Sequence, residues 1–383
     1  MFPIQNPLPT ATVNDLTIRI DGAVTTRHCL AGDTVIVHAT SAWPITLRSL
    51  VDRKDGVVLT MREASVLSSQ APFAFLTHEP AQLYRLTTYT GRSIEATAEQ
   101  PFLTRDGWRP LSALGPSDSV AVVAEYPQLF GRGDTEADLV KLLAYFTADG
   151  TGGDAAAPMF SDPVVRTDLE AAVESQGDEC VEVTDGGVTQ LRVRGRGTTR
   201  SQVIAYLDLV GVHGVRAPDK FVPDFVFGLK KDRLRLFLNR LFTCDGEAEP
   251  SDRITYRTAS MRMARQVQHL LTRFGVVSLL RGREHQDALE AVELVIVGKA
   301  DVLRFIDEIG FLGDKATRAE AIRAALYHVR MTDPPPDRLG PILFDRVLAV
   351  EATVSAPVYD LTVEGSHNFV ANDFIVHNST RRR

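Results

Sequence analysis

The chain has 383 residues, of which 44% are hydrophobic and 24% are charged, and its formal net charge is -7. This length allows two or three domains, the composition is that of an ordinary globular protein, and no apolar run predicts a membrane span. The N-terminus lacks signal-peptide features, and three cysteines without CxxC spacing disfavour structural disulfides and a zinc site. We therefore expect a cytoplasmic monomer with no membrane partner, and the net negative charge alone disfavours nucleic-acid binding.

The first third of the chain reads as short strands and turns. Residues 1–28 contain an alternating run that predicts one or two strands without a core of their own. At Cys29 the sequence changes to CLAGDT, a tight turn that leads into a strand. Alternating runs, separated by turns at residues 90–91 and 106–107, continue to about residue 125. This stretch predicts an all-β half-domain.

The middle of the chain changes to helical periodicity after a linker, PQLFGRGD. From about residue 134 to about residue 330, predicted helices alternate with strands. Two apolar helices in this region end in the same Asp-Gly pair, with Asp149 and Asp245 96 residues apart, which indicates an internal duplication. After a proline-rich break, residues 341–378 return to β alternation. We predict a β unit that is interrupted by an α/β insert and then completed.

The stretch from residue 358 to residue 379 collects side chains that can carry out chemistry. It contains an acid, an imidazole and a polar triplet, namely Asp360, His367 and then His377, Asn378 and Ser379. The amide of an Asn side chain can attack its own carbonyl, and a succinimide forms as the following peptide bond breaks. A preceding His can polarise that carbonyl or protonate the departing amine, and a following Ser is a nucleophile. Such a triplet alone is typical of a solvated tail, so its significance depends on the second nucleophile, Cys29.

Three stretches together resemble the splicing motifs of inteins. They are CLAGDT at Cys29, SIEATAEQPFLT at residues 93–104 and the stretch 358–379. Their sequences most resemble those of inteins in replicative helicases. The resemblance covers residues 29–378. It implies a mostly β, horseshoe-like Hint splicing domain, with these segments: extein fragment 1–28, Hint halves 29–125 and 341–378, and extein fragment 379–383. The flanking host sequences would act in cis.

The resemblance also implies a sequence of reactions that needs no cofactor. The Cys29 thiol attacks the carbonyl before it and forms a thioester, Ser379 takes over the acyl group, and Asn378 cyclises to release the intein. By the same resemblance Asp360 assists the exchange of nucleophiles, while His367 and His377 support Asn378. The residues alone also allow structural roles. A lone Cys is typically a small buried hydrophobic residue. Asp360 could cap a turn, and His367 could be a structural histidine that makes hydrogen bonds.

One position departs from the family pattern. The middle motif is Thr-x-x-His, in which the His polarises the amide at the N-terminal junction, but here Thr97 is followed by Gln100. A Gln amide donates a hydrogen bond but does not deliver a proton, and losing a general acid costs on the order of 10²–10⁴ in rate. We therefore hypothesise that cleavage before Cys29 is slow unless another group takes over this role.

The insert, residues 134–330, resembles a two-motif LAGLIDADG homing endonuclease, an α/β unit with pseudo-twofold symmetry. Its motifs are LLAYFTADG and LNRLFTCDG. The resemblance implies that the two helices pack together and that Asp149 and Asp245 bind Mg²⁺ for cleavage of double-stranded DNA. Ala144 suits a close helix contact, whereas Arg240 stands at the equivalent place in the second helix. An acid before a Gly turn is otherwise a common helix end.

Basic residues gather in the insert. Residues 186–285 hold 18 Lys and Arg against 9 Asp and Glu, and Lys220 matches the family's Lys-x-x-Pro element near the scissile phosphate. Alternating arginines predict basic faces on two strands: Arg192, Arg194 and Arg196 on one, Arg253 and Arg257 on the other. A solvated surface lysine and a solvated strand face are the alternative interpretations.

Three other classes of protein fit parts of the sequence. A splicing element with an inactive nuclease is disfavoured by the presence of both acids. A hedgehog-like autoprocessing domain makes the same first thioester but normally lacks the Asn378 and Ser379 pair. A β-rich binding module would not need nucleophiles at both junctions. The sequence therefore favours an intein that splices itself and carries a homing endonuclease.

Overall fold

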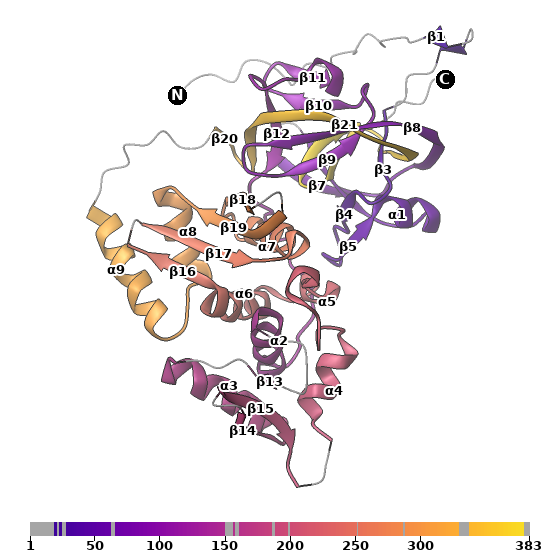
Figure 1. The fold of residues 1–383 in the computed structure, drawn as a ribbon. Helices are drawn as coiled ribbons and strands as arrows, with labels where there is room; N and C mark the ends of the chain where they lie inside the picture. Colours follow the sequence, from indigo (N-terminus) through magenta and orange to yellow (C-terminus); the bar gives the residue numbers. More distant parts are fainter. Residues whose placement is uncertain are drawn as a thin grey trace. The chain divides into compact units, whose positions relative to one another are not determined.

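The structure, a computed structural model, describes most of the chain. The described residues are 19–20, 23–24, 28–62, 66–149, 156–157, 161–185, 188–197, 200–250, 252–285, 288–328 and 337–378. The chain divides into two compact units, the first made of Met1–Leu129 with Pro335–Arg383 and the second of Phe130–Pro334 (Figure 1). The predicted architecture, a mostly β unit interrupted by an α/β unit, is confirmed.

The first unit consists mainly of antiparallel strands. They are β1 (Arg19–Ile20), β2 (Ala23–Val24), β3 (Leu30–Ala31), β4 (Val35–Val37), β5 (Pro44–Thr46), β6 (Val58–Arg62), β7 (Val66–Gln70), β8 (Ala74–Thr88), β9 (Ser93–Ala96), β10 (Pro101–Thr104), β11 (Gly107–Pro110), β12 (Ser119–Val123), β20 (Arg338–Leu339), β21 (Ile342–Thr362), β22 (Asn368–Ala371) and β23 (Phe374–His377). The helix α1 (Leu47–Arg53) begins where the Thr46 hydroxyl accepts a hydrogen bond from the Ser49 amide.

Strands from the two ends of the chain alternate within one ten-stranded sheet. Its main order is β11-β10-β23-β12-β21-β3-β9-β8, and β21 also pairs with β8. In this order β23 lies between β10 and β12, and β21 pairs with β12 from Ile342 to Arg346. The apolar core is shared in the same way, because Val123 and Ile375 belong to one buried cluster. The segment after the insert therefore completes the sheet rather than forming a separate domain.

Asparagine side chains attach the C-terminal strands to the N-terminal half. The Asn368 side chain accepts a hydrogen bond from the Met61 amide at 2.7 Å and donates to the Met61 carbonyl at 2.9 Å. The Asn372 side chain accepts from the Val35 amide at 2.7 Å, and Asn372 adopts a left-handed backbone with φ 47°. Each bond joins a main-chain group of the N-terminal half to a side chain of β22 or of the turn after it, so these contacts hold β22 and β23 in register.

The second unit alternates helices and strands. Its helices are α2 (Ala137–Asp149), α3 (Pro163–Ser175), α4 (Gln202–Leu209), α5 (Asp224–Phe227), α6 (Lys231–Asp245), α7 (Met261–Arg273), α8 (Lys299–Glu308) and α9 (Asp314–His328). Its strands are β13 (Ala156–Ala157), β14 (Asp178–Asp185), β15 (Val188–Gly195), β16 (Gly246–Glu249), β17 (Arg253–Thr258), β18 (Leu279–His285) and β19 (Ala288–Ile296). No helix in the described part of the chain is long and apolar enough to cross a membrane.

The predicted internal duplication is visible around two central helices. In this unit α2 and α6 pack against each other, and each is followed in the chain by its own antiparallel sheet, with strand orders β13-β15-β14 and β16-β17-β19-β18 (Figure 1). The helix α3 packs on β14, and α7 packs on β17, β18 and β19. Apolar residues of both halves form one buried core, in which Leu143 and Phe242 are fully buried. Each half thus covers the apolar helix face that the other half could not bury alone.

Candidate functional site

The N-terminal junction lies in the sheet of the first unit. Leu30 pairs with Ala96 of β9 and with Tyr359 of β21, and Cys29 just before it is fully buried. The Cys29 amide donates to the Thr97 hydroxyl at 3.2 Å, and the Thr97 amide donates to the Cys29 carbonyl at 2.9 Å. The peptide nitrogen between His28 and Cys29 is therefore held by a side chain of the middle motif.

The predicted acid Asp360 lies on the strand that pairs with this junction. Leu30 pairs with Tyr359 in antiparallel register, so Cys29 and Asp360 are the next residues at the same end of that pairing. Asp360 is only 1% exposed. The backbone register therefore places the buried Asp360 opposite Cys29 on the neighbouring strand.

The C-terminal junction is built around Asn378, which is fully buried. Its amide donates to the His367 carbonyl at 3.1 Å. Its own carbonyl oxygen lies 2.6 Å from Nδ1 of His377, and Nε2 of Gln100 donates to the His377 carbonyl at 2.8 Å. Hydrogen bonds with His367, His377 and Gln100 thus hold the backbone on either side of Asn378. Ser379 lies outside the described residues.

Aromatic rings bring the two junctions together. The ring of His377 lies 6.3 Å from that of His28, 6.4 Å from that of His367 and 4.9 Å from that of Trp108, measured between centroids. Since His28 precedes Cys29 and His377 precedes Asn378, residues that flank the two expected cleavage points are neighbours in space. The contact of Trp108 with His377 was not predicted, because the sequence showed Trp108 only as a residue after a turn.

The imidazole of His377 is neutral at physiological pH because its pKa is low. Its pKa is lowered to about 4, mainly by burial and also by repulsion from His28 and His367, although the hydrogen bond with the Asn378 carbonyl raises it. A neutral imidazole has one N–H, and the Asn378 carbonyl can only accept, so Nδ1 carries the proton and donates. The ring therefore polarises the carbonyl that the Asn378 side chain would attack.

The low pKa of His377 predicts an acid-sensitive fold. Between pH 4 and the ordinary histidine pKa of 6.5 the unfolded chain binds more protons than the folded chain, so the free energy of unfolding rises with pH. This contribution, on the order of 3 kcal/mol, is complete above pH 6.5 and is lost as pH falls to 4. We expect the Tm of Asn378→Ala to fall as the pH is lowered from 6.5 to 4. The Tm of His377→Gln/Asn378→Ala should fall less over the same range. Equal slopes in thermal denaturation would contradict the assignment.

Gln100 faces the C-terminal junction. The family pattern led us to expect its amide near the nitrogen between His28 and Cys29, but the structure shows that Nε2 donates to the carbonyls of His377 and Pro101, at 2.8 and 3.2 Å. The N-terminal amide is instead bonded to Thr97. The turn from Thr97 to Gln100, closed by a 3.1 Å bond from the Gln100 amide to the Thr97 carbonyl, thus contacts one junction at each end.

A second candidate site lies where the two motif helices of the inserted unit end. The structure describes Asp149 as the last residue of α2, but its side chain and Gly150 lie outside the described atoms. Asp245 ends α6 and is partly exposed. Gly246 is required there, because a Cβ at this position would lie 2.6 Å from the Phe242 carbonyl oxygen. The Asp-Gly pair therefore ends the helix and leaves the acid accessible.

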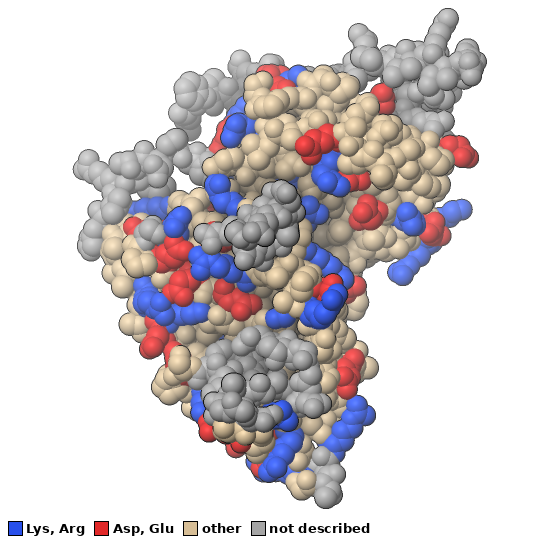
Figure 2. Space-filling model, in the orientation of Figure 1, with Lys and Arg blue, Asp and Glu red and all other residues tan. Residues whose placement is uncertain are grey.

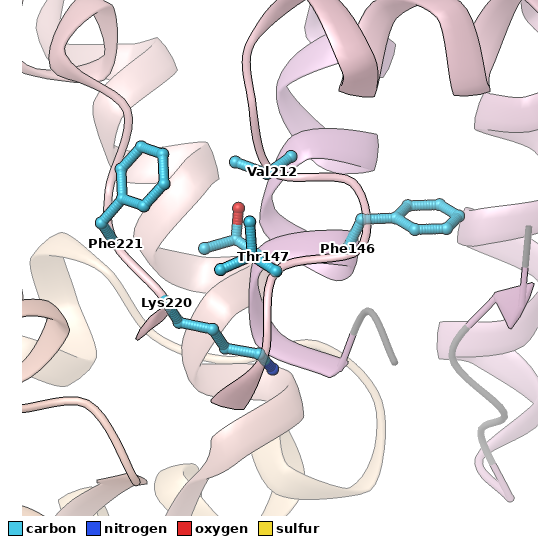
Figure 3. Close-up of a pocket in the computed structure, with 6 residues that line it drawn as sticks. Phe146, Thr147, Val212, Lys220 and Phe221 are labelled. Carbon is cyan, nitrogen blue, oxygen red and sulfur yellow. The ribbon is translucent and has the colours of Figure 1, made fainter. Parts of the chain in front are cut away.

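Lys220 contacts the end of the first motif helix. Its Nζ donates to the carbonyl of Ala148, the residue before Asp149. Figure 3 shows the side chain extending toward the last turn of α2. It borders a small pocket, whose lining residues are Phe146, Thr147, Val212, Val215, Lys220 and Phe221. Lys220 thus contacts the backbone of α2 one residue before Asp149.

The second motif helix has a lysine that the sequence did not single out. Nζ of Lys315 donates to three carbonyls at the end of α6, those of Thr243 at 2.8 Å, Cys244 at 3.0 Å and Gly246 at 2.6 Å. Burial lowers the pKa of this lysine. Lys220 follows Asp149 by 71 residues and Lys315 follows Asp245 by 70, so the duplication itself was the available signal.

Arg240 replaces a small residue in the second motif and builds a different contact. Its guanidinium binds both carboxylate oxygens of Asp168 on α3, at 2.8 and 3.0 Å, and the hydroxyl of Tyr145 on α2 donates to the same carboxylate at 2.7 Å. Burial raises the pKa of Asp168, but the hydrogen bonds from Arg240 and Tyr145 outweigh it and the net pKa is lowered. The two motif helices are therefore joined through an ionised, bidentate pair.

The basic strand faces are partly neutralised. Arg194 pairs with Glu179 at 2.8 Å, and in the second half Arg253 pairs with Glu249 at 2.6 Å. A further pair joins Arg257 to Glu293 at 2.8 Å. Figure 2 shows Lys and Arg interspersed with Asp and Glu on the visible face of the second unit. The local excess of positive charge thus overstates how basic these faces are, because glutamates on neighbouring strands offset the arginines.

The described side chains alone do not complete a metal centre. Among them, no three His, Cys, Asp or Glu residues are grouped to hold a metal ion. Mg²⁺ is usually bound by one or two carboxylates together with phosphate oxygens of the substrate, and it keeps several waters. Asp245 supplies one carboxylate at an accessible helix end, so the residues present fit such an ion.

Comparison with known proteins gives one family and two groups of similar proteins. The sequence profile of the intein splicing domain matches residues 35–378. The replicative DNA helicase DnaB of Rhodothermus marinus is 27% identical over 92% of this chain and 46% of the helicase, and that of Synechocystis sp. (strain ATCC 27184 / PCC 6803 / Kazusa) is 26% identical over 92% and 49%. The chain spans about half the length of these curated relatives.

Two solved structures are also similar to parts or most of the chain. A DnaB intein from Synechocystis sp. PCC 6803 shares 14% identity with a TM-score of 0.35, covering 92% of this chain and 99% of that one. The structure of I-DmoI in complex with DNA and Mn shares 11% identity with a TM-score of 0.32, covering 45% of this chain and 97% of that one.

Proposed function

The chain belongs to the intein splicing domain family, and we propose that it excises itself through Cys29, Asn378 and Ser379. The observation that carries this proposal is the arrangement at Asn378: the His377 ring lies 2.6 Å from its carbonyl and 6.3 Å from the His28 ring of the other junction. A side chain that polarises one cleavage point is therefore beside the other, as ligation of two flanks requires.

The first proposed step converts an amide to a thioester. The Cys29 sulfur attacks the His28 carbonyl carbon, a C–S bond forms, the C–N bond to Cys29 breaks, and the thiol proton ends on the freed amine. The hydrogen bond from the Cys29 amide to Thr97 holds this nitrogen in place. Ser379 then attacks the thioester, so that residues 1–28 move to its hydroxyl and the Cys29 thiol is restored. The buried Asp360 supports this exchange.

The last proposed step releases the intein. The Asn378 side-chain nitrogen attacks its own carbonyl carbon, the bond to Ser379 breaks, a succinimide forms and the Ser379 amine leaves with a proton. Donation from His377 Nδ1 stabilises the negative charge that develops on the carbonyl oxygen. The ester between the flanks then rearranges to a peptide bond on the freed amine.

The test is intact mass after expression in bacteria. The wild-type chain is expected to give a product of residues 29–378 with a C-terminal succinimide, together with a ligated peptide of residues 1–28 and 379–383. Cys29→Ala/Asn378→Ala is expected to remain full length. Cleavage before Cys29 without ligation would support the hedgehog-like alternative, and cleavage at the C-terminal bond alone would show that the first step fails. An unchanged wild-type chain would refute self-processing.

We further propose that the second unit is a homing endonuclease that cuts double-stranded DNA. The pairing of α2 with α6, each ending in Asp-Gly with a lysine at its last carbonyls, supports this function. Asp149 and Asp245 would hold Mg²⁺, which activates water and stabilises the leaving oxygen when bound. Lys220 and Lys315 add positive charge at the same helix ends. An inactive nuclease is the alternative.

A further inference from the structure

Gln100 has an orientation that its neighbours determine. Its side chain is 1% exposed, and Nε2 faces the carbonyl oxygens of His377 and Pro101 at 2.8 and 3.2 Å. Both neighbours can only accept hydrogen bonds, so the group facing them is the NH₂ end of the amide. Its oxygen is buried and has no partner among the residues that the structure describes. Donation toward the C-terminal junction therefore fixes this side chain.

The bond from Gln100 completes the restraint of the residue that would cyclise. The carbonyl before Asn378 is held by Gln100, the Asn378 amide by the His367 carbonyl, and the Asn378 carbonyl by the His377 ring. Formation of a succinimide requires the side-chain nitrogen to approach its own carbonyl carbon in an aligned geometry. Fixing the peptide between His377 and Asn378 reduces the number of backbone conformations from which this approach can start.

We propose that Gln100 is a positioning residue for the cyclisation of Asn378, while Thr97 of the same motif holds the N-terminal amide. The inference rests on the proposed splicing reaction. It assigns to the middle motif a role at both junctions, through a turn whose ends contact Cys29 and His377.

The test separates the two junctions by mutation. In Cys29→Ala only the C-terminal bond can break, and its rate is measured by intact mass as loss of residues 379–383. Gln100→Met keeps the size of the side chain but removes the donor. Since one neutral hydrogen bond is worth about 0.5–1.5 kcal/mol, we expect this rate to fall about two- to tenfold. In Asn378→Ala the rate of dithiothreitol-induced cleavage before Cys29 gives the N-terminal reference, and the ratio of C-terminal to N-terminal rates should fall.

A pH profile distinguishes positioning from simple packing. Gln100→Glu has the same shape, but its carboxylate only accepts hydrogen bonds, whereas its protonated form donates. We expect its C-terminal rate, divided by that of Cys29→Ala at each pH, to rise as pH falls from 8 to 5. A packing role would leave this ratio constant. Thermal denaturation confirms that each variant is folded at the assay temperature.

Each outcome decides one claim. Equal C-terminal rates for Gln100→Met and its parent, with the parent active, would overturn the role of Gln100 and leave splicing intact. A fall confined to the dithiothreitol reaction would place Gln100 at the N-terminal junction and also overturn the inference. No C-terminal cleavage in Cys29→Ala would overturn the proposed chemistry at Asn378, and the inference with it.

Discussion

Replacing Cys29 by alanine is expected to abolish ligation of residues 1–28 to the C-terminal flank. Without the thiol no thioester forms, and Ser379 has no activated carbonyl to attack. Cyclisation of Asn378 does not use this thiol, so the C-terminal flank should still be released. The measurement is a time course of intact mass, in which the ligated peptide of 33 residues disappears from the products.

The matched control is another cysteine of the same chain. Cys180 is half-buried on β14 of the second unit, and burial raises its pKa to about 12, so it is no nucleophile at neutral pH. Cys180→Ala should therefore splice like the wild type. Ligated peptide from Cys29→Ala would rule out the thioester route, and loss of ligation in Cys180→Ala would show that the assay reports folding rather than chemistry.

The architecture was predictable because its signals are local and ordered. Strand alternation, the change to helical periodicity near residue 134 and the repeated Asp-Gly ends each depend on a few neighbouring residues. The structure confirms the mostly β unit with an α/β insertion. The alternation of β23 between β10 and β12 was not predictable in this way, because it joins segments that lie more than 200 residues apart in the sequence.

The site was predictable residue by residue but not contact by contact. The order of the motifs pointed to Cys29 and Asn378. In the structure the rings of the preceding residues, His28 and His377, lie 6.3 Å apart. The contact of Gln100 with His377 joins residues 277 positions apart, and no local pattern records which junction an amide will face. The family resemblance led us to expect the Gln100 amide near the Cys29 nitrogen, but its NH₂ group donates to the His377 carbonyl instead.

Charge was the least reliable signal in the insert. The sequence shows a local excess of arginines. It does not show which of them form salt bridges, because the partner glutamates lie on other strands. The pairs of Arg194 with Glu179 and of Arg257 with Glu293 have partners 15 and 36 residues away. Arg240 is similar, because its partner Asp168 is 72 residues away. The pairs of Arg194 and Arg257, whose side chains are exposed, are worth about 0–1 kcal/mol each.

Changing Asp245 to asparagine is expected to abolish DNA cleavage by the second unit. The substitution keeps the size of the side chain but removes the negative charge that would hold Mg²⁺. Loss of residues that only support a metal ligand costs about 10–100-fold, so loss of a ligand should lower the rate by about a hundredfold or more. Cleavage is measured on a supercoiled plasmid library in Mg²⁺, with sequencing of the cut ends, and DNA binding is measured by gel shift.

The control is Asp307→Asn, which changes an exposed acid of α8 in the same unit and should leave cleavage unchanged. Splicing provides an internal check, because the proposed reaction at Cys29 and Asn378 uses no residue of the second unit. We expect Asp245→Asn to splice normally and to retain DNA binding. If it cuts DNA like the wild type, the metal site is elsewhere. If the wild type binds DNA but cuts no sequence in the library, the inactive-nuclease alternative is correct, and Lys220 and Lys315 then serve only to cap the two helix ends.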